Sequence, residues 1–237
     1  MAARRHRGSA VGQAGRDDAV RVVRSNLLVA IQDLRNPVVV VTSAQPGEGK
    51  SSTAVALARS LALGGTRVAL VDVDLRRPRA HQLLGATGAP GCADVLEGRR
   101  SLADCLQALA IPGGPPTARP LAFLPAGAPA ADATELLAGP ATRALLQDLA
   151  DAAEVVLVDA PPVLAVADTL AIGRLAAGAV LVVEARRTSA QTANRAKAAL
   201  IRNQTRILGV VLNQVRPADD AAASALGYGP VPRRSSP

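Results

Sequence analysis

The sequence is poor in aromatic residues. Among its 237 residues there is no Trp, one Phe and one Tyr, so Ala, Val and Leu must form the core. Proteins that bind single-stranded nucleic acid stack the bases on aromatic side chains, and this chain cannot supply such a platform. We therefore expect no nucleic-acid partner, and any bound base must be held by other contacts.

Cysteine and long apolar runs are also scarce. Cys92 and Cys105 are isolated, without a CxxC motif or a Cys/His cluster, so neither a zinc site nor a disulfide framework is indicated. No uncharged run exceeds fourteen residues, whereas a membrane-spanning helix needs about 20. The N-terminal arginines are not followed by an apolar stretch, unlike a secretory signal. We expect a cytoplasmic protein.

The positive charge is concentrated at the two ends. The formal net charge is +8, yet residues 1–16 hold four arginines and no acid, and the last five residues hold two more. The remainder is nearly neutral, which argues against a nucleic-acid-binding face. We divide the chain into a basic, disordered leader (1–16), one domain (17–215) and a flexible tail (216–237). The basic ends either attract acidic lipids or partners, or are solvated.

Short apolar runs alternate with segments that suit helices. Helical spacing predicts helices over 17–34 and 50–63, and the segment 111–120 is a Pro/Gly-rich surface loop. The apolar runs are 38–41, 68–72, 121–124, 155–159, 180–183 and 207–212. Continuous apolar strands between helices predict an α/β fold, with a mostly parallel sheet covered by helices on both faces.

The most specific motif is SAQPGEGKSS, which follows the first apolar run. A glycine-rich turn between a strand and a helix points backbone N–H groups at a phosphate, and the helix N-terminus adds positive charge. In such a loop Lys50 reaches the terminal phosphates and Ser51 binds Mg²⁺. Ala44 stands where the usual pattern has its first glycine; the alternative is an ordinary glycine turn. The nucleotide-binding candidates are Pro46, Gly47, Glu48, Gly49, Lys50, Ser51 and Ser52.

Two further runs end in acidic residues. Asp72 and Asp74 follow the run that begins at residue 68, and Asp159 ends the run that begins at residue 155. Ligands of parallel α/β sheets bind at the carboxyl ends of the strands, so these acids are candidates for proton transfer and for holding a cation. The alternative for Asp72 and Asp74 is a charged strand end neutralised by the arginines that follow.

Together these motifs resemble the bacterial tyrosine kinases of capsule and exopolysaccharide synthesis. The resemblance rests on SAQPGEGKSS, VDVDLRRP and VDAPPVL in this order, and on GCADVLEG, ATELLAG and GVVLNQV. It extends from about residue 18 to residue 215 and implies a P-loop NTPase fold that uses ATP and Mg²⁺. By position, the resemblance implies that Lys50, Asp72 and Asp74 are catalytic, with Asp72 as the base, and that Ser51, Asp72 and Asp159 serve the metal. Asn213 lies where related ATPases recognise adenine, although an Asn that simply ends a strand is equally consistent.

The chain departs from this family at two places. Asp18, Arg21 and Arg24 resemble its E-x-x-R-x-x-R oligomerisation motif with Asp for Glu, and the alternative is an ion pair within one helix. The family also has a tyrosine-rich tail, whereas Tyr228 is the single tyrosine here. Tyr228 is therefore the one possible acceptor for phosphorylation of the chain by itself or by another copy.

Competing classes lack their most specific residues. Partition ATPases have a signature lysine five residues before the loop lysine, where this chain has Gln45, and the CxxC of iron–sulfur carriers is absent. We expect a Mg·ATP-dependent protein-tyrosine kinase that forms a homo-oligomer. The resemblance further implies a membrane adaptor of the polysaccharide co-polymerase type, protein tyrosine substrates, and a place at the inner face of the cytoplasmic membrane. The alternatives are a nucleotide-switched ATPase and a scaffold without turnover.

Overall fold

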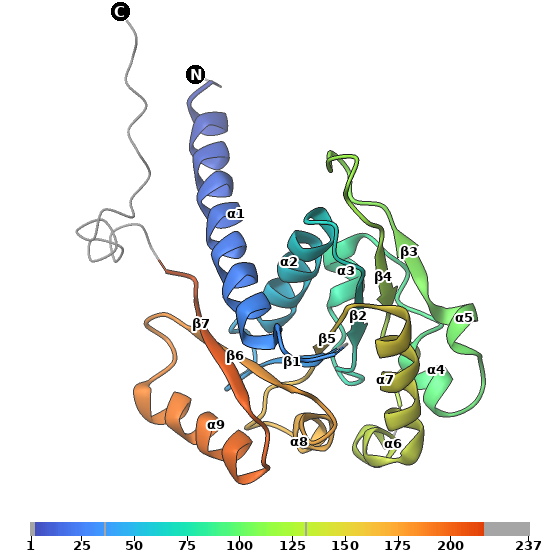
Figure 1. Ribbon diagram of the computed structural model, residues 1–237. Coiled ribbons are helices and arrows are strands. Elements are labelled where there is room, and N and C mark those ends of the chain that lie inside the picture. The colour runs from blue at the N-terminus through green and yellow to red at the C-terminus, as the bar shows by residue number, and fades with distance from the viewer. Residues whose placement is uncertain (1–2, 36, 131, 216–237) are drawn as a thin grey trace, which may run out of the picture.

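The computed structural model describes residues 3–35, 37–130 and 132–215. Its centre is a seven-stranded sheet in the order β3-β4-β2-β5-β1-β6-β7 (Figure 1). All neighbouring strands run parallel except the pair β3 and β4. The strands are β1 Val38–Ser43, β2 Val68–Asp72, β3 Gln107–Leu109, β4 Leu121–Leu124, β5 Val155–Asp159, β6 Gly178–Glu184 and β7 Ile207–Asn213. The predicted α/β fold with a mostly parallel sheet is confirmed.

Helices cover both faces of this sheet. Helices α1 and α2 pack with one face, and α7, α8 and α9 pack with the other. The helices are α1 Ala3–Ile31, α2 Lys50–Leu63, α3 Ala80–Leu84, α4 Cys92–Leu96, α5 Leu102–Cys105, α6 Ala133–Ala138, α7 Pro140–Ala152, α8 Asp168–Gly173 and α9 Ala190–Arg202. Among the described residues, no helix is both long enough and apolar enough to cross a membrane.

The apolar runs of the central strands result from burial on both sides. In β1, Val38 and Val40 pack into the core beneath α7 to α9, whereas Val39 and Val41 pack against α1 and α2. Successive side chains of a strand point to opposite faces, so both sets must be apolar. Both cysteines are free and buried in the first of these two cores.

The structure differs from the sequence expectations at two points. Strand β3, which pairs antiparallel with β4 at the sheet edge, has three residues and no apolar run that could predict it. Helix α1 begins at Ala3, so residues 3–16 lie within a helix in this structure, where the sequence analysis expected a disordered leader. Ala, Arg and Gln are good helix formers. The tail 216–237, with Tyr228, lies outside the described residues.

Candidate active site

The predicted phosphate loop joins the end of β1 to the start of α2. Gly47 and Gly49 both have φ of +89°, a conformation that L side chains rarely adopt, and α2 begins at Lys50. Ala44 is fully buried and is not among the residues with positive φ. That position therefore does not need the glycine of the usual pattern, and the loop forms with alanine there.

Lys50 extends from the loop toward the acids at the ends of β2 and β5. Its Nζ lies 2.8 Å from Asp74 Oδ2, 3.5 Å from Asp159 Oδ1 and 3.3 Å from Ser51 Oγ. Burial opposes the charge of Lys50, but the carboxylates of Asp159 and Asp74 outweigh it, so its pKa lies above the ordinary value. The predicted lysine and acids thus meet at the carboxyl ends of the strands.

Asp72 is fully buried and is held by backbone N–H groups. Its Oδ1 accepts a hydrogen bond from the N–H of Asp74 (3.0 Å), and its Oδ2 accepts from those of Arg79 and Ala80 (3.2 Å each). Burial, with the neighbouring charge of Asp159, raises the pKa of Asp72 to about 7. The three hydrogen bonds give Asp72 a role in shaping the loop 73–79, and its predicted role as the base stays a prediction.

Asp159 is the residue best suited to a cation. It is fully buried. Its Oδ1 lies at ion-pair distance, 3.5 Å, from Lys50 Nζ, and neither carboxylate oxygen has a short hydrogen bond from residues 3–35, 37–130 and 132–215. Burial raises the pKa of Asp159 although the charge of Lys50 opposes that shift. Buried polar atoms are normally satisfied, so these oxygens fit a Mg²⁺ ion or its water shell. Within the described part of the chain, no group of three or more His, Cys, Asp or Glu could hold a metal ion.

The arginines after Asp74 have separate tasks. The backbone N–H of Arg77 donates to Asp74 Oδ1 at 3.0 Å. The side chain of Arg76 points away to the fully buried Asp168, with 3.1 Å between Nε and Oδ2, and also donates to Thr134. The arginines that follow therefore do not simply neutralise Asp72 and Asp74, because Lys50 pairs with Asp74 and Arg76 pairs with Asp168.

Asn213, at the end of β7, contacts the phosphate loop directly. Its Nδ2 donates to the backbone carbonyl of Glu48 at 2.9 Å, and a Cβ on Gly49 would come within 2.1 Å of this nitrogen. Asn213 therefore does more than end a strand. Its side-chain amide occupies space that is open only because residue 49 is a glycine. Its predicted contact with adenine stays a prediction.

The remaining predicted residues lie apart from Lys50. Pro46 and Ser52 are exposed on the loop and the first turn of α2. On α1, Arg21 pairs with Asp18 at 3.2 Å, and both side chains are about 70% exposed (68% and 73%). Arg24 instead donates to the carbonyl of Ser60, near the end of α2, at 2.9 Å. The i,i+3 ion pair that was the alternative interpretation of this motif is present. Of the three motif residues, Asp18 and Arg21 have exposed side chains that could contact a second copy, whereas Arg24 contacts α2.

One residue that contacts the phosphate loop could not be predicted from the sequence. Thr188, in the segment between β6 and α9, donates its hydroxyl hydrogen to Glu48 Oε1. The pairing of β1 with β6 brings this segment beside the loop, with Ser43 opposite Val182. No motif marks residues 185–189, so only the sheet order could reveal this contact.

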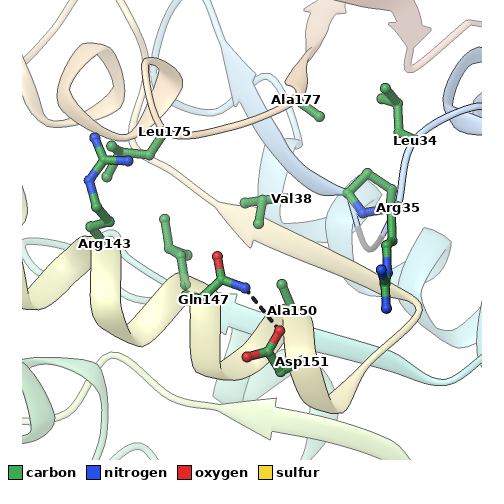
Figure 2. Close-up of a pocket in the computed structure, with 11 residues that line it drawn as sticks. Leu34, Arg35, Val38, Arg143, Gln147, Ala150, Asp151, Leu175 and Ala177 are labelled. Atoms are coloured by element: carbon green, nitrogen blue, oxygen red, sulfur yellow. Dashed lines mark hydrogen bonds between the residues drawn. The ribbon is translucent and has the colours of Figure 1, made fainter.

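A cavity of about 550 Å³ lies at the other end of the sheet (Figure 2). It opens beside Val38, the first residue of β1, and its lining includes Arg35 before β1, Arg143 and Gln147 of α7, and Leu175. Because the phosphate loop follows the last residue of β1, this cavity is separate from the candidate active site.

Comparison with known proteins agrees with this geometry. The ParA family model, described as NUBPL iron-transfer P-loop NTPase, matches residues 35–220. The chain is 33% identical over 222 residues to tyrosine-protein kinase YwqD of Bacillus subtilis, covering 90% of this chain and 91% of YwqD. It is 29% identical over 201 residues to tyrosine-protein kinase wzc of Salmonella typhimurium, covering 84% of this chain but 27% of wzc.

A solved structure supports the same grouping. The kinase domain of Escherichia coli tyrosine kinase ETK superposes with a TM-score of 0.77 at 28% identity, covering 84% of this chain and 75% of that one. The family model identifies a ParA-type P-loop NTPase domain, and YwqD, wzc and ETK are tyrosine kinases. The chain belongs to the bacterial tyrosine-protein kinase family, built on a ParA-type P-loop NTPase domain.

Proposed function

We propose that this chain is a Mg·ATP-dependent protein-tyrosine kinase that regulates exopolysaccharide or capsule synthesis and export. The observation that carries the proposal is the position of Lys50, whose ammonium lies between Asp74 and Asp159 at the mouth of the phosphate loop. The names of the relatives support the reaction.

The residues divide the work of phosphoryl transfer. The N–H groups of the loop and Lys50 bind the phosphates, and Ser51 and Asp159, with Asp72, hold the metal. Mg²⁺, when bound, neutralises charge that develops on the phosphates. The tyrosine oxygen attacks the terminal phosphorus, the bond to the ADP oxygen breaks, and Asp72 accepts the phenol proton. Asp74 keeps Lys50 aligned by their 2.8 Å contact.

Within the chain the proposed acceptor is Tyr228. It is the single tyrosine of the sequence, so phosphorylation of the chain by itself or by another copy has one possible site. Protein tyrosines outside the chain are the further proposed substrates.

The proposed surroundings are a homo-oligomer and a membrane adaptor. Exposed Asp18 and Arg21 on α1 are available for contact with a second copy. We place the protein in the cytoplasm, held at the inner membrane face by an adaptor of the polysaccharide co-polymerase type. Retention of the chain in membrane fractions only when the adaptor is present tests this placement.

The second candidate function is a nucleotide-switched ATPase without kinase activity, which the match to the general ParA model favours. Gln45 weakens it, because the signature lysine of that class is missing. Hydrolysis of ATP without phosphotyrosine in the parent protein supports the switch. Loss of phosphotyrosine in Tyr228→Phe with ATP turnover retained supports the kinase.

The decisive experiment is incubation with labelled ATP and Mg²⁺, followed by phosphoamino-acid analysis. Lys50→Met is expected to lower transfer by about 10² to 10³-fold or more, the usual cost of losing charge stabilisation. Lys197→Met is the matched control, since Lys197 is the other lysine of the chain and is exposed on α9. Unchanged labelling of Tyr228 in Lys50→Met contradicts the role of Lys50.

A further inference from the structure

Glu48 places an acidic side chain inside the phosphate loop. A carboxylate that faced the bound phosphates would repel them, and this repulsion is strong where water is excluded. The Glu48 side chain is nevertheless 1% exposed and lies within the protein. Its contacts show how the charge is kept away from the loop interior.

Both carboxylate oxygens of Glu48 are occupied. Oε2 accepts from the backbone N–H of Gln45 at 2.8 Å, and Oε1 accepts from the hydroxyl of Thr188. The Thr188 oxygen in turn accepts from the backbone N–H of Glu184 at 3.0 Å. A hydroxyl has one hydrogen to donate, and with the Glu184 N–H directed at its oxygen, that hydrogen is directed at Glu48.

The segment that carries Thr188 is itself fixed to the strands. The N–H of Ala185 donates to the carbonyl of Asn213 at 2.9 Å, and the N–H of Thr188 donates to that of Glu184 at 3.0 Å. The guanidinium of Arg187 pairs with Glu184 at 3.1 Å, and a Cβ on Gly47 would lie 3.1 Å from Arg187 Nη1. Thr188 therefore approaches Glu48 from a supported position beside the loop.

We propose that Thr188 is a positioning residue of the nucleotide site, and that its hydroxyl keeps the Glu48 carboxylate turned away from the bound phosphates. We call this contact the Glu48–Thr188 latch. It rests on the proposed nucleotide binding. Without the hydroxyl, Glu48 Oε1 loses its donor, and the Gln45 N–H alone holds the carboxylate against turning toward the N–H groups that the phosphates need.

The test measures the affinity for a non-hydrolysable ATP analogue with Mg²⁺ by calorimetry, on the full chain. Thr188→Val, nearly isosteric, is expected to weaken binding by about tenfold, the scale of one hydrogen bond to a charged group. Thr188→Ser, which keeps the hydroxyl, is expected to restore the affinity. Thr192→Val is the matched control, because Thr192 lies one turn further along and its hydroxyl contacts Ser189 (3.0 Å).

The double variant Thr188→Val/Glu48→Gln distinguishes an effect of the Glu48 charge from a packing defect caused by the loss of the Thr188 hydroxyl. With Glu48→Gln added to Thr188→Val, the freed side chain carries no charge, so binding is expected to be several-fold tighter than in Thr188→Val alone. A packing defect would not be relieved in this way. Thermal unfolding without nucleotide serves as the folding check: Thr188→Val is expected to unfold in one cooperative transition at a lower midpoint, because a buried acceptor loses its donor, whereas Thr192→Val is expected to shift little.

Each outcome has one consequence. If the parent chain binds the analogue and Thr188→Val binds it equally well, the latch is wrong and the proposed function stands. If the double variant is as weak as Thr188→Val, the charge of Glu48 is not what Thr188 restrains, and the proposal is likewise wrong. If the parent chain shows no affinity, the nucleotide site itself is wrong and the latch falls with it.

Discussion

Asp72 and Asp159 are register partners at the ends of two adjacent parallel strands. Each is fully buried, and Lys50 from the phosphate loop is the cation beside them. The pKa of Asp72 is raised to about 7 by burial and by the charge of Asp159. This pair therefore stores unfavourable electrostatic energy in the folded chain at neutral pH, which a bound cation would relieve.

The stability of the metal-free chain should fall as pH rises from about 4 to about 7. The Asp72 carboxyl loses its proton near 3.8 when unfolded but keeps it until about 7 when folded, so unfolding releases a proton across this window. Asp159, whose pKa is also raised, acts in the same direction. Urea unfolding at several pH values, without nucleotide or metal, measures the slope, and Asp72→Asn should flatten it.

The control for this slope is Asp148→Asn, on the exposed side of α7, which should leave it unchanged. An equal slope in the parent chain and in Asp72→Asn would contradict the raised pKa of Asp72.

Lys50→Met should also lower the free energy of unfolding at pH 7. It removes the ammonium that compensates Asp74 and Asp159, and breaking a buried ion pair by removing one partner costs about 3–5 kcal/mol. The raised pKa of Lys50 means that its contribution is fully present below pH 10.5 and is lost as pH rises through the folded value. Chemical unfolding of Lys50→Met and of Lys50→Met/Asp74→Asn measures this cost.

The double variant should regain part of the stability, because one unpaired carboxylate is gone. Equal stability of the parent chain and Lys50→Met would contradict the pairing of Lys50 with these acids.

Gly49→Ala should abolish nucleotide binding at a modest cost in stability. The new Cβ would come within 2.1 Å of Asn213 Nδ2, so the Asn213 amide must move and lose its hydrogen bond to Glu48. The positive φ adds about 1–2 kcal/mol of strain. Calorimetric titration with nucleotide and chemical unfolding check the two effects.

Gly85→Ala provides the matched comparison. Gly85 also has positive φ, +66°, but a Cβ there meets nothing within 4 Å in the described chain. It should show the strain without the loss of binding. Loss of binding in both variants would mean that strain, and not the contact with Asn213, is responsible.

Arg24→Ala and Arg21→Ala should have different effects although both residues belong to one motif. Arg24 donates to the Ser60 carbonyl in the last turn of α2, where a cation also interacts favourably with the helix dipole, so its loss should cost about 1–3 kcal/mol. Arg21 forms an exposed pair, and such pairs add little to stability. Arg21→Ala should instead reduce self-association in sedimentation velocity.

An unchanged sedimentation profile of Arg21→Ala at concentrations where the parent chain associates would count against Asp18 and Arg21 as contact residues. A stability loss confined to Arg21→Ala would reverse the assignment of the two arginines.

Much of the fold was predictable because burial on both faces leaves a clear mark in the sequence. The runs 68–72, 121–124 and 155–159 coincide with β2, β4 and β5, since a central strand of a parallel sheet is apolar throughout. Strand β3 has half-buried and exposed residues and left no such mark. The helicity of residues 3–16 was missed because net charge does not report helix propensity.

The sequence by itself determined where six strands lie along the chain (β1, β2, β4, β5, β6 and β7), the phosphate loop and the acids that end β2 and β5, because these features depend on local chemistry and on apolar runs. Only the tertiary structure decided that Lys50 pairs with Asp74, that Arg24 binds α2 while Arg21 stays exposed, and that Thr188 holds Glu48. These contacts join residues from 24 to 140 positions apart or depend on which side of a helix faces its neighbour. Such pairings follow from the order and register of the strands, which no local pattern encodes.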